Sequence, residues 1–169
     1  KVLSLSWITL KSYLKLFLKN SVLPMIPVTK SFLPSLNTYT DYLSRVWDKK
    51  MITNRGELVV ELEKKLKDSL NLNHLLCTNN GTIPIQIALK LFAKGGEVIT
   101  TPFSYVATTA AIQWENCTPV FVDIDSEYWT IDENKIENAI TEKTTCILAT
   151  HVFGNPCNIK VIEKIAKQY

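Results

Sequence analysis

A short polar turn at residues 78–82, Thr-Asn-Asn-Gly-Thr, carries the residue types of this chain that best suit anion binding. It lies between the apolar residues 75–77 and a longer apolar run, so the pattern predicts a strand, a turn and a helix. The first N–H groups of a helix lack internal partners and carry the positive end of the helix dipole. Asn80, Gly81 and Thr82 are therefore predicted to bind a phosphate. The alternative is an ordinary turn in which Asn80 or Thr82 caps the helix.

Two further polar segments, at residues 101–105 and 151–156, follow apolar runs that suit buried strands. Ligands of parallel sheets bind at the carboxyl ends of strands, so we expect these segments to share one crevice with residues 78–82. Tyr105 would place an aromatic ring there, although an aromatic residue at a helix start more often belongs to the core. No Gly-x-Gly-x-x-Gly follows a strand, which argues against a dinucleotide. A single phosphate beside a stacking ring favours a monophosphate cofactor such as pyridoxal phosphate.

The elements that must position these segments alternate regularly along the chain. Helical spacing covers residues 35–50, with Ser35 or Asn37 as the cap, and about 56–70. The strands expected after that are 75–77, 97–101, 119–123 and 146–150, and the helices are 82–93, 105–113, 132–140 and 158–169. Gly95 and Gly96 end one helix, and Asp132 begins another. We predict an α/β fold with a mostly parallel sheet and helices on both faces.

Charge and composition exclude some classes of protein. The 169 residues contain 19 Lys and Arg against 16 Asp and Glu, but four of the lysines lie in residues 1–24, which have no acidic residue. The rest of the chain is close to neutral and contains only two arginines, which argues against nucleic-acid binding. Lysines interrupt every long apolar run of residues 1–24, so this segment is too polar to span a bilayer. It suits a membrane-surface or targeting helix, or upstream sequence that precedes a natural start at Met25.

The cysteines and two aspartates offer weaker chemical signals. Cys77, Cys117, Cys146 and Cys157 lack the close paired spacing of a zinc site. We interpret them as small apolar residues in a reducing compartment and predict no metal. Asp123 and Asp125 resemble paired catalytic carboxylates, but their place after a strand favours a role in ordering a turn.

Several ordered blocks of the sequence resemble the amino-terminal part of the DegT/StrS-type sugar-nucleotide aminotransferases. The blocks are Asn80-Gly-Thr, residues 97–109, residues 118–125, Ile131-Asp, residues 139–144 and His151-Val-Phe-Gly-Asn-Pro. The resemblance begins near Met25, with Ile26-Pro-Val-Thr-Lys-Ser-Phe-Leu-Pro, and continues to Tyr169. It implies part of the large domain of a fold-type I enzyme that uses pyridoxal 5′-phosphate.

The resemblance also implies roles for individual residues. Gly81 and Thr82, with Asn80 beside them, match the positions that hold the cofactor phosphate, and Tyr105 matches the aromatic that stacks on the pyridine ring. Thr53, Asn54 and Gly56 match a substrate-side loop near a dimer interface, although Arg55 interrupts the small residues usual there.

The activity implied is transfer of an amino group from glutamate to a nucleotide-linked 4-keto-6-deoxysugar. The start at Ile26 and the segment around His151 are most similar to the subgroup that aminates C4 of dTDP-4-keto-6-deoxyglucose. The family implies a cytoplasmic homodimer, and we expect neither a nucleic-acid nor a membrane partner.

The chain departs from the family in one respect that bears on catalysis. Complete members are more than twice as long, and their cofactor lysine matches a position beyond Tyr169. No lysine in residues 25–169 matches that motif, so we assign no catalytic residue and expect the 169-residue chain to be inactive alone. Residues 1–24 are then upstream sequence, residues 25–72 an N-terminal helical segment and residues 73–169 an incomplete cofactor-binding domain. The alternatives are a sugar dehydratase of the same family, in which a histidine replaces the lysine, and a non-catalytic remnant or binding protein.

Overall fold

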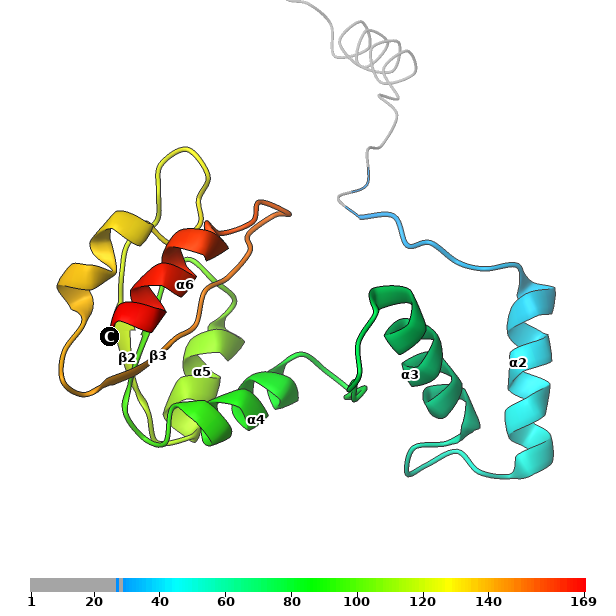
Figure 1. Cartoon of the computed structure of the whole chain (residues 1–169). Coiled ribbons are helices and arrows are strands. Elements are labelled where there is room, and N and C mark those ends of the chain that lie inside the picture. The colour runs from blue at the N-terminus through cyan, green and yellow to red at the C-terminus, as the bar shows by residue number, and fades with distance from the viewer. Residues whose placement is uncertain (1–26, 28) are drawn as a thin grey trace, which may run out of the picture. The chain divides into compact units, whose positions relative to one another are not determined.

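The computed structural model describes residue 27 and residues 29–169. The prediction of a basic amphipathic segment at residues 1–24 lies outside the described residues. The chain divides into two compact units, one ending at Leu62 and the other comprising Glu63–Tyr169. Figure 1 labels helices and strands of both units.

The described part of the first unit contains helices and irregular connecting segments. Helix α2 spans Leu36–Lys49, and helix α3, Glu57–Leu70, begins in this unit. The Ser35 hydroxyl accepts a hydrogen bond from the backbone N–H of Thr38 at 3.2 Å, which caps α2 as predicted. Arg45 donates to Glu57 at 2.5 Å and to Glu61 at 2.6 Å. These bonds raise the pKa of Arg45 and lower that of Glu57.

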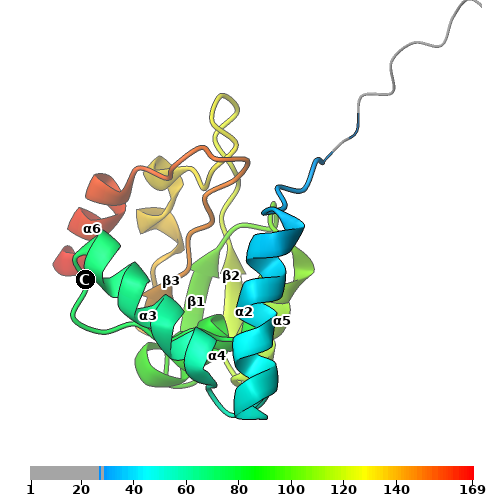
Figure 2. The same ribbon diagram turned by 90° about the vertical axis from the view of Figure 1, so that its right-hand side faces the viewer.

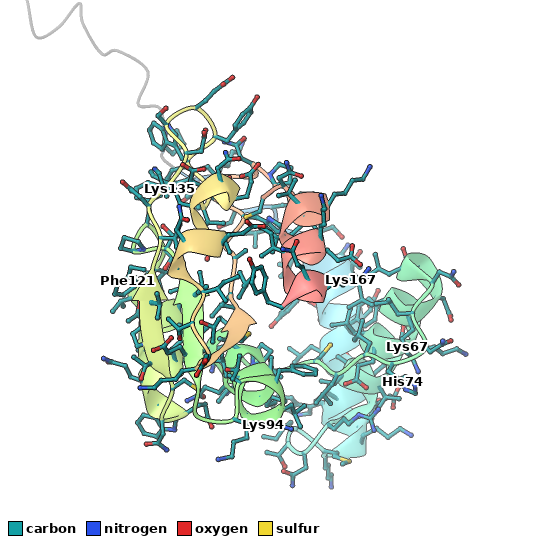
Figure 3. The ribbon with its side chains drawn as sticks, turned by 60° about the vertical axis from the view of Figure 1, so that its left-hand side comes forward. Lys67, His74, Lys94, Phe121, Lys135 and Lys167 are labelled. Atoms are coloured by element: carbon teal, nitrogen blue, oxygen red, sulfur yellow. The ribbon has the colours of Figure 1, made fainter. Side chains whose placement is uncertain are left out.

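Three parallel strands form the sheet of the second unit, with β1 at its centre. The strands are β1 (Glu97–Thr100), β2 (Thr118–Phe121) and β3 (Thr144–Ile147), in the order β2-β1-β3. Figure 2 shows them side by side, and Figure 3 labels Phe121 on the outer strand β2. The helices of this unit, besides the end of α3, are α4 (Thr82–Phe92), α5 (Val106–Trp114) and α6 (Ile159–Gln168). The predicted parallel α/β fold is confirmed.

Helices cover both faces of the sheet because neighbouring residues of β1 point to opposite sides. Val98 packs in one apolar layer with α4 and α5, and Ile99 packs in a second layer with α6. The other buried residues of the first layer are Leu89, Ala93, Ala111, Ile112 and Cys117, and those of the second are Val122, Ile131, Ile136, Cys157, Ile162 and Ile165. Cys117 and Cys157 are thus core residues, as expected for small apolar side chains.

The predicted strand at residues 75–77 is wrong. Both sides of β1 are occupied, by β2 and β3, and residues 75–77 pair with no strand in the described part of the chain. The backbone N–H of Cys77 instead donates to Oε1 of Glu63 at 3.0 Å. Glu63 is 2% exposed, and its carboxylate satisfies a donor that a sheet would otherwise have used.

The predicted helix at residues 132–140 is also wrong, because two short 3₁₀ turns take its place. They are η1 (Glu133–Lys135) and η2 (Glu137–Ala139). Forming the first turn of a helix costs free energy, which the burial of apolar side chains must repay. Among residues 133–139 only Ile136, which lies between the two turns, is fully buried. The cap is as predicted, since Oδ1 of Asp132 accepts from the N–H of Asn134 at 3.1 Å.

Candidate functional site

The turn at residues 78–82 uses part of its hydrogen-bonding capacity internally. Oδ1 of Asn80 accepts from the backbone N–H of Thr82 at 2.9 Å and from that of Ile83 at 3.1 Å. The Thr78 hydroxyl donates to the carbonyl of Asn80 at 2.8 Å. Asn80 therefore caps α4, as the alternative interpretation predicts.

Two donors of this turn stay available for a ligand. Within the described residues, neither the backbone N–H of Gly81 nor the hydroxyl of Thr82 has a hydrogen-bond partner. A Cβ atom added at Gly81 would meet no atom within 4 Å, so the approach to the backbone is open. With the positive end of the α4 dipole, this donor pair fits one phosphate group. The phosphate would lie beside the Asn80 carboxamide or displace it from the Thr82 amide.

Tyr105 lies at the N-cap position of α5, and its side chain is 80% exposed. It lines a pocket of about 320 Å³ with residues 102–104, Thr150, Val152 and Phe153. The turn at residues 78–82 does not line this pocket. Of the three polar segments predicted to share a crevice, the two that follow β1 and β3 line this pocket.

A cluster of three aromatic rings adjoins this pocket, and the sequence patterns did not reveal it. Phe103, Trp129 and Phe153 pack edge to face, with ring centroids 5.9 to 6.2 Å apart. They come from the loops after β1, β2 and β3, at the carboxyl end of the sheet. Figure 2 shows the loop after β2, in yellow, and the loop after β3, in orange, at the same end. Such ring pairs contribute about 0.5–1.5 kcal/mol each beyond the area that they bury.

Two of these aromatic residues have a left-handed backbone, which costs an L-residue about 1–2 kcal/mol. Phe153 has φ 53° and Trp129 has φ 63°. Phe153 and Gly154, φ 87°, are the central residues of a turn closed by a 2.8 Å hydrogen bond from the N–H of Asn155 to the carbonyl of Val152. Two left-handed central residues are typical of a type I′ turn, in which Asn or Gly is usual. A Phe-Gly pair at a turn that favours Asn-Gly therefore marks Phe153 in the sequence, but it does not reveal the other two rings.

The remaining titratable groups near this edge order the loops. Oδ1 of Asp125 accepts from the N–H groups of Glu127 and Tyr128, at 2.8 and 2.9 Å, so its interpretation as a turn residue is confirmed. Nδ1 of His151 accepts from the N–H of Cys157 at 2.9 Å, and burial raises the pKa of the Cys157 thiol. No group of three or more potential metal ligands occurs among the residues that the structure describes.

The predicted substrate-side loop lies between α2 and α3. Thr53 and Asn54 are exposed there, and Asn54 and Arg55 have left-handed φ values of 56° and 59°. A Cβ atom at Gly56 would lie 3.3 Å from the carbonyl oxygen of Met51, so glycine suits the close turn. The contact of Thr53, Asn54 and Gly56 with a substrate stays a prediction.

No helix in the described ranges combines the length and apolar character that crossing a bilayer requires. The longest helices among the described residues, α2 and α3, have 14 residues each.

Comparison with known families identifies the chain. Residues 36–169 match the model of the DegT/DnrJ/EryC1/StrS aminotransferase family. The match includes the turn at residues 78–82, Tyr105 and all three aromatic residues of the cluster.

Individual curated proteins of known type are also similar to this chain. The chain is 47% identical over 144 residues to a dTDP-4-amino-4,6-dideoxy-D-glucose transaminase of Escherichia coli, a match that covers 85% of this chain and 39% of the relative. It is 32% identical over 129 residues to a GDP-perosamine synthase of Escherichia coli O157:H7, covering 75% of this chain and 35% of the relative. The chain thus spans about two fifths of the length of the relatives that it matches.

Solved structures share the fold. The sugar aminotransferase CalS13 from Micromonospora echinospora aligns with a TM-score of 0.77 at 25% identity, covering 85% of this chain and 39% of that one. A putative sugar aminotransferase, Spr1654, from Streptococcus pneumoniae, in its PLP form, aligns with a TM-score of 0.76 at 26% identity, covering 85% and 36%.

Proposed function

Because the chain belongs to the DegT/DnrJ/EryC1/StrS aminotransferase family, we propose that it is the cofactor-phosphate-binding part of a sugar-nucleotide aminotransferase that uses pyridoxal 5′-phosphate. The proposed reaction moves an amino group from glutamate to a nucleotide-linked 4-keto-6-deoxysugar. The 47% identity to a dTDP-4-amino-4,6-dideoxy-D-glucose transaminase supports this substrate class. We also propose that the whole protein is a cytoplasmic homodimer whose loop at residues 53–56 faces the substrate.

The donor pair at the N-terminus of α4 is the observation that carries the proposal. The N–H of Gly81 and the hydroxyl of Thr82 bind the cofactor phosphate, and the α4 dipole stabilises its charge. The exposed ring of Tyr105 orients the cofactor by lying against its pyridine ring. When bound, the cofactor supplies an electron-withdrawing pyridinium that lets an amino donor lose its Cα proton. No residue of this chain is assigned to move that proton.

Binding of pyridoxamine 5′-phosphate to the chain tests the cofactor role without any need for turnover. This form has no aldehyde and therefore does not react with surface lysines. We expect Thr82→Val to weaken its binding about tenfold, because the valine keeps the shape but loses the hydroxyl donor to an anion. Tyr105→Ala should weaken binding of the same ligand through loss of the stacked ring. Calorimetry provides the affinities.

Thr118→Val is the matched control, since Thr118 is exposed on β2 and makes no side-chain hydrogen bond in the described structure. The affinity of this variant for pyridoxamine 5′-phosphate should equal that of the unchanged chain. Equal affinity for all four proteins, or no binding by the unchanged chain, would contradict the proposal.

The DNA that follows the codon for Tyr169 separates the alternatives. A continuing reading frame with a lysine at the family's cofactor position supports the aminotransferase. A histidine at that position supports the dehydratase, and an immediate stop codon supports a non-catalytic protein.

A further inference from the structure

We propose that the pocket lined by Phe103, Tyr105 and Phe153 binds the C6 methyl end of a 6-deoxyhexose. We call it the aromatic pocket. The inference rests on the proposed function and deepens it, because it names the part of the substrate that this surface recognises.

The lining of the aromatic pocket favours an uncharged group. No Lys, Arg, Asp or Glu lines it, and Ser104, Tyr105 and Thr150 supply its side-chain hydroxyls. A diphosphate is recognised by cations or by several N–H donors, so the phosphates of a nucleotide sugar do not suit this surface. Its volume of about 320 Å³ is at the lower end of the range for small-molecule sites. One ring or the end of one sugar fits such a space, and a whole nucleotide sugar does not.

Proximity to Tyr105 selects the hexose over the nucleobase. In the proposed function Tyr105 lies against the cofactor, which reacts with a sugar carbonyl at C4. C5, which carries C6, is bonded directly to C4, whereas the base is separated from the hexose by two phosphates and a ribose. C3 is also bonded to C4, but it carries a hydroxyl, and the uncharged, largely apolar lining of the pocket suits the C5–C6 end better. In a 6-deoxyhexose that end is a methyl group, which aromatic side chains desolvate favourably.

The backbone supports a ligand role for these rings. Phe153 is 81% exposed although its φ of 53° is unfavourable for Phe, so burial in the folded chain does not repay that conformation. Trp129 does not line the pocket, but its ring packs edge to face on both Phe103 and Phe153 and holds them in place. An aromatic ring kept in the open at a conformational cost is typical of a binding surface.

Saturation-transfer NMR with two matched ligands tests the inference. The ligands are dTDP-6-deoxyglucose and dTDP-glucose, which differ only in the hydroxyl on C6, and both are measured with pyridoxamine 5′-phosphate present. We expect the chain to bind the 6-deoxy ligand about tenfold more tightly, since one apolar group in a fitted pocket has an effect of this size. Irradiation of the aromatic protons should transfer most saturation to the C6 methyl protons.

Phe153→Asn separates this role from folding. Asn is favoured at a left-handed turn position, so the variant should unfold at the same temperature as the unchanged chain or higher. It should bind pyridoxamine 5′-phosphate normally but lose the preference for the 6-deoxy ligand. Phe92→Asn, which removes another exposed phenyl ring at the end of α4, should keep that preference.

The outcomes distinguish the two proposals. Suppose that pyridoxamine 5′-phosphate binds normally but the two nucleotide sugars bind equally well or not at all. This result overturns only the proposal that the aromatic pocket binds the C6 methyl end. Equal competition by dTDP lacking a sugar also overturns it, because the rings would then hold the base. A 6-deoxy preference without cofactor binding supports the pocket and contradicts the proposed cofactor site.

Discussion

The side-chain Nδ2 of Asn155 donates a hydrogen bond to the backbone carbonyl of Tyr128 at 3.0 Å. Asn155 ends the turn that carries Phe153, and Tyr128 immediately precedes Trp129. This bond therefore joins the loops after β2 and β3 beside the aromatic cluster. Since the Phe153 and Trp129 rings also touch each other, one polar and one aromatic contact fix the two loops.

Asn155→Ala should loosen both loops. We expect the free energy of unfolding to fall by about 1 kcal/mol, the usual net contribution of one hydrogen bond. Amide hydrogen exchange at residues 126–130 should become faster, because the Tyr128 carbonyl loses its partner on the other loop. Asn138→Ala is the control, since Asn138 is exposed and makes no side-chain hydrogen bond in the described structure. Unchanged exchange in the Asn155 variant would show that the aromatic contact alone holds the loops.

Two glycines should respond in opposite ways to the same added methyl group. A Cβ atom at Gly96 would lie 2.4 Å from Cγ2 of Thr145 and 2.9 Å from the carbonyl oxygen of Lys143, whereas a Cβ atom at Gly81 meets nothing within 4 Å. Gly96→Ala should lower the free energy of unfolding by about 1–3 kcal/mol through overpacking. Gly81→Ala should change it by less than about 0.5 kcal/mol while weakening the binding of pyridoxamine 5′-phosphate. Urea unfolding and calorimetry measure the two effects, and equal stability of the two variants would contradict the packing at Gly96.

The buried carboxylate of Glu63 should stabilise the second unit. It accepts from the N–H of Cys77 and is 2% exposed. Glu63→Ala should cost about 2 kcal/mol in urea unfolding, because it leaves a polar backbone group without that partner. Glu63→Gln keeps an acceptor oxygen and should cost less. Lys64→Ala, an exposed change on the same helix, should stay within about 0.5 kcal/mol of the unchanged chain.

Local patterns predicted most of the secondary structure and the parallel sheet. Runs such as residues 97–101, and caps such as Ser35 and Asp132, act through neighbours in the sequence, and the structure confirms them. The wrong predictions concern elements that depend on contacts between residues far apart in the sequence. Whether residues 75–77 form a strand depends on a partner strand far away in the sequence, and they pair with none within the described residues.

In the candidate site, too, the local features were predictable and the long-range contacts were not. Tyr105 is exposed at the start of α5, and the residues around Gly81 begin α4, as the patterns indicated. The aromatic cluster was not predictable, because Phe103, Trp129 and Phe153 meet only when three loops fold to one end of the sheet. The left-handed backbone at Phe153 was not predictable either, since side-chain propensity at this turn position favours Asn or Gly.

The ion pair between Asp132 and Lys135 should make stability depend on pH in acid. Its N···O distance is 2.9 Å, and the hydrogen bond from Lys135 lowers the pKa of Asp132, helped by the N–H of Asn134. A lowered folded-state pKa stabilises the protein above the ordinary aspartate pKa near 4, and this contribution is lost as the pH falls through the folded-state pKa. Asp132→Asn should therefore cost about 0.5–1 kcal/mol in urea unfolding at pH 6 and progressively less as the pH falls through the folded-state pKa of Asp132. Lys135→Met should produce the same loss at pH 6, and the double variant should lose no more than either single one, because both changes remove one interaction. Additive losses in the double variant would show that the two side chains stabilise the fold independently.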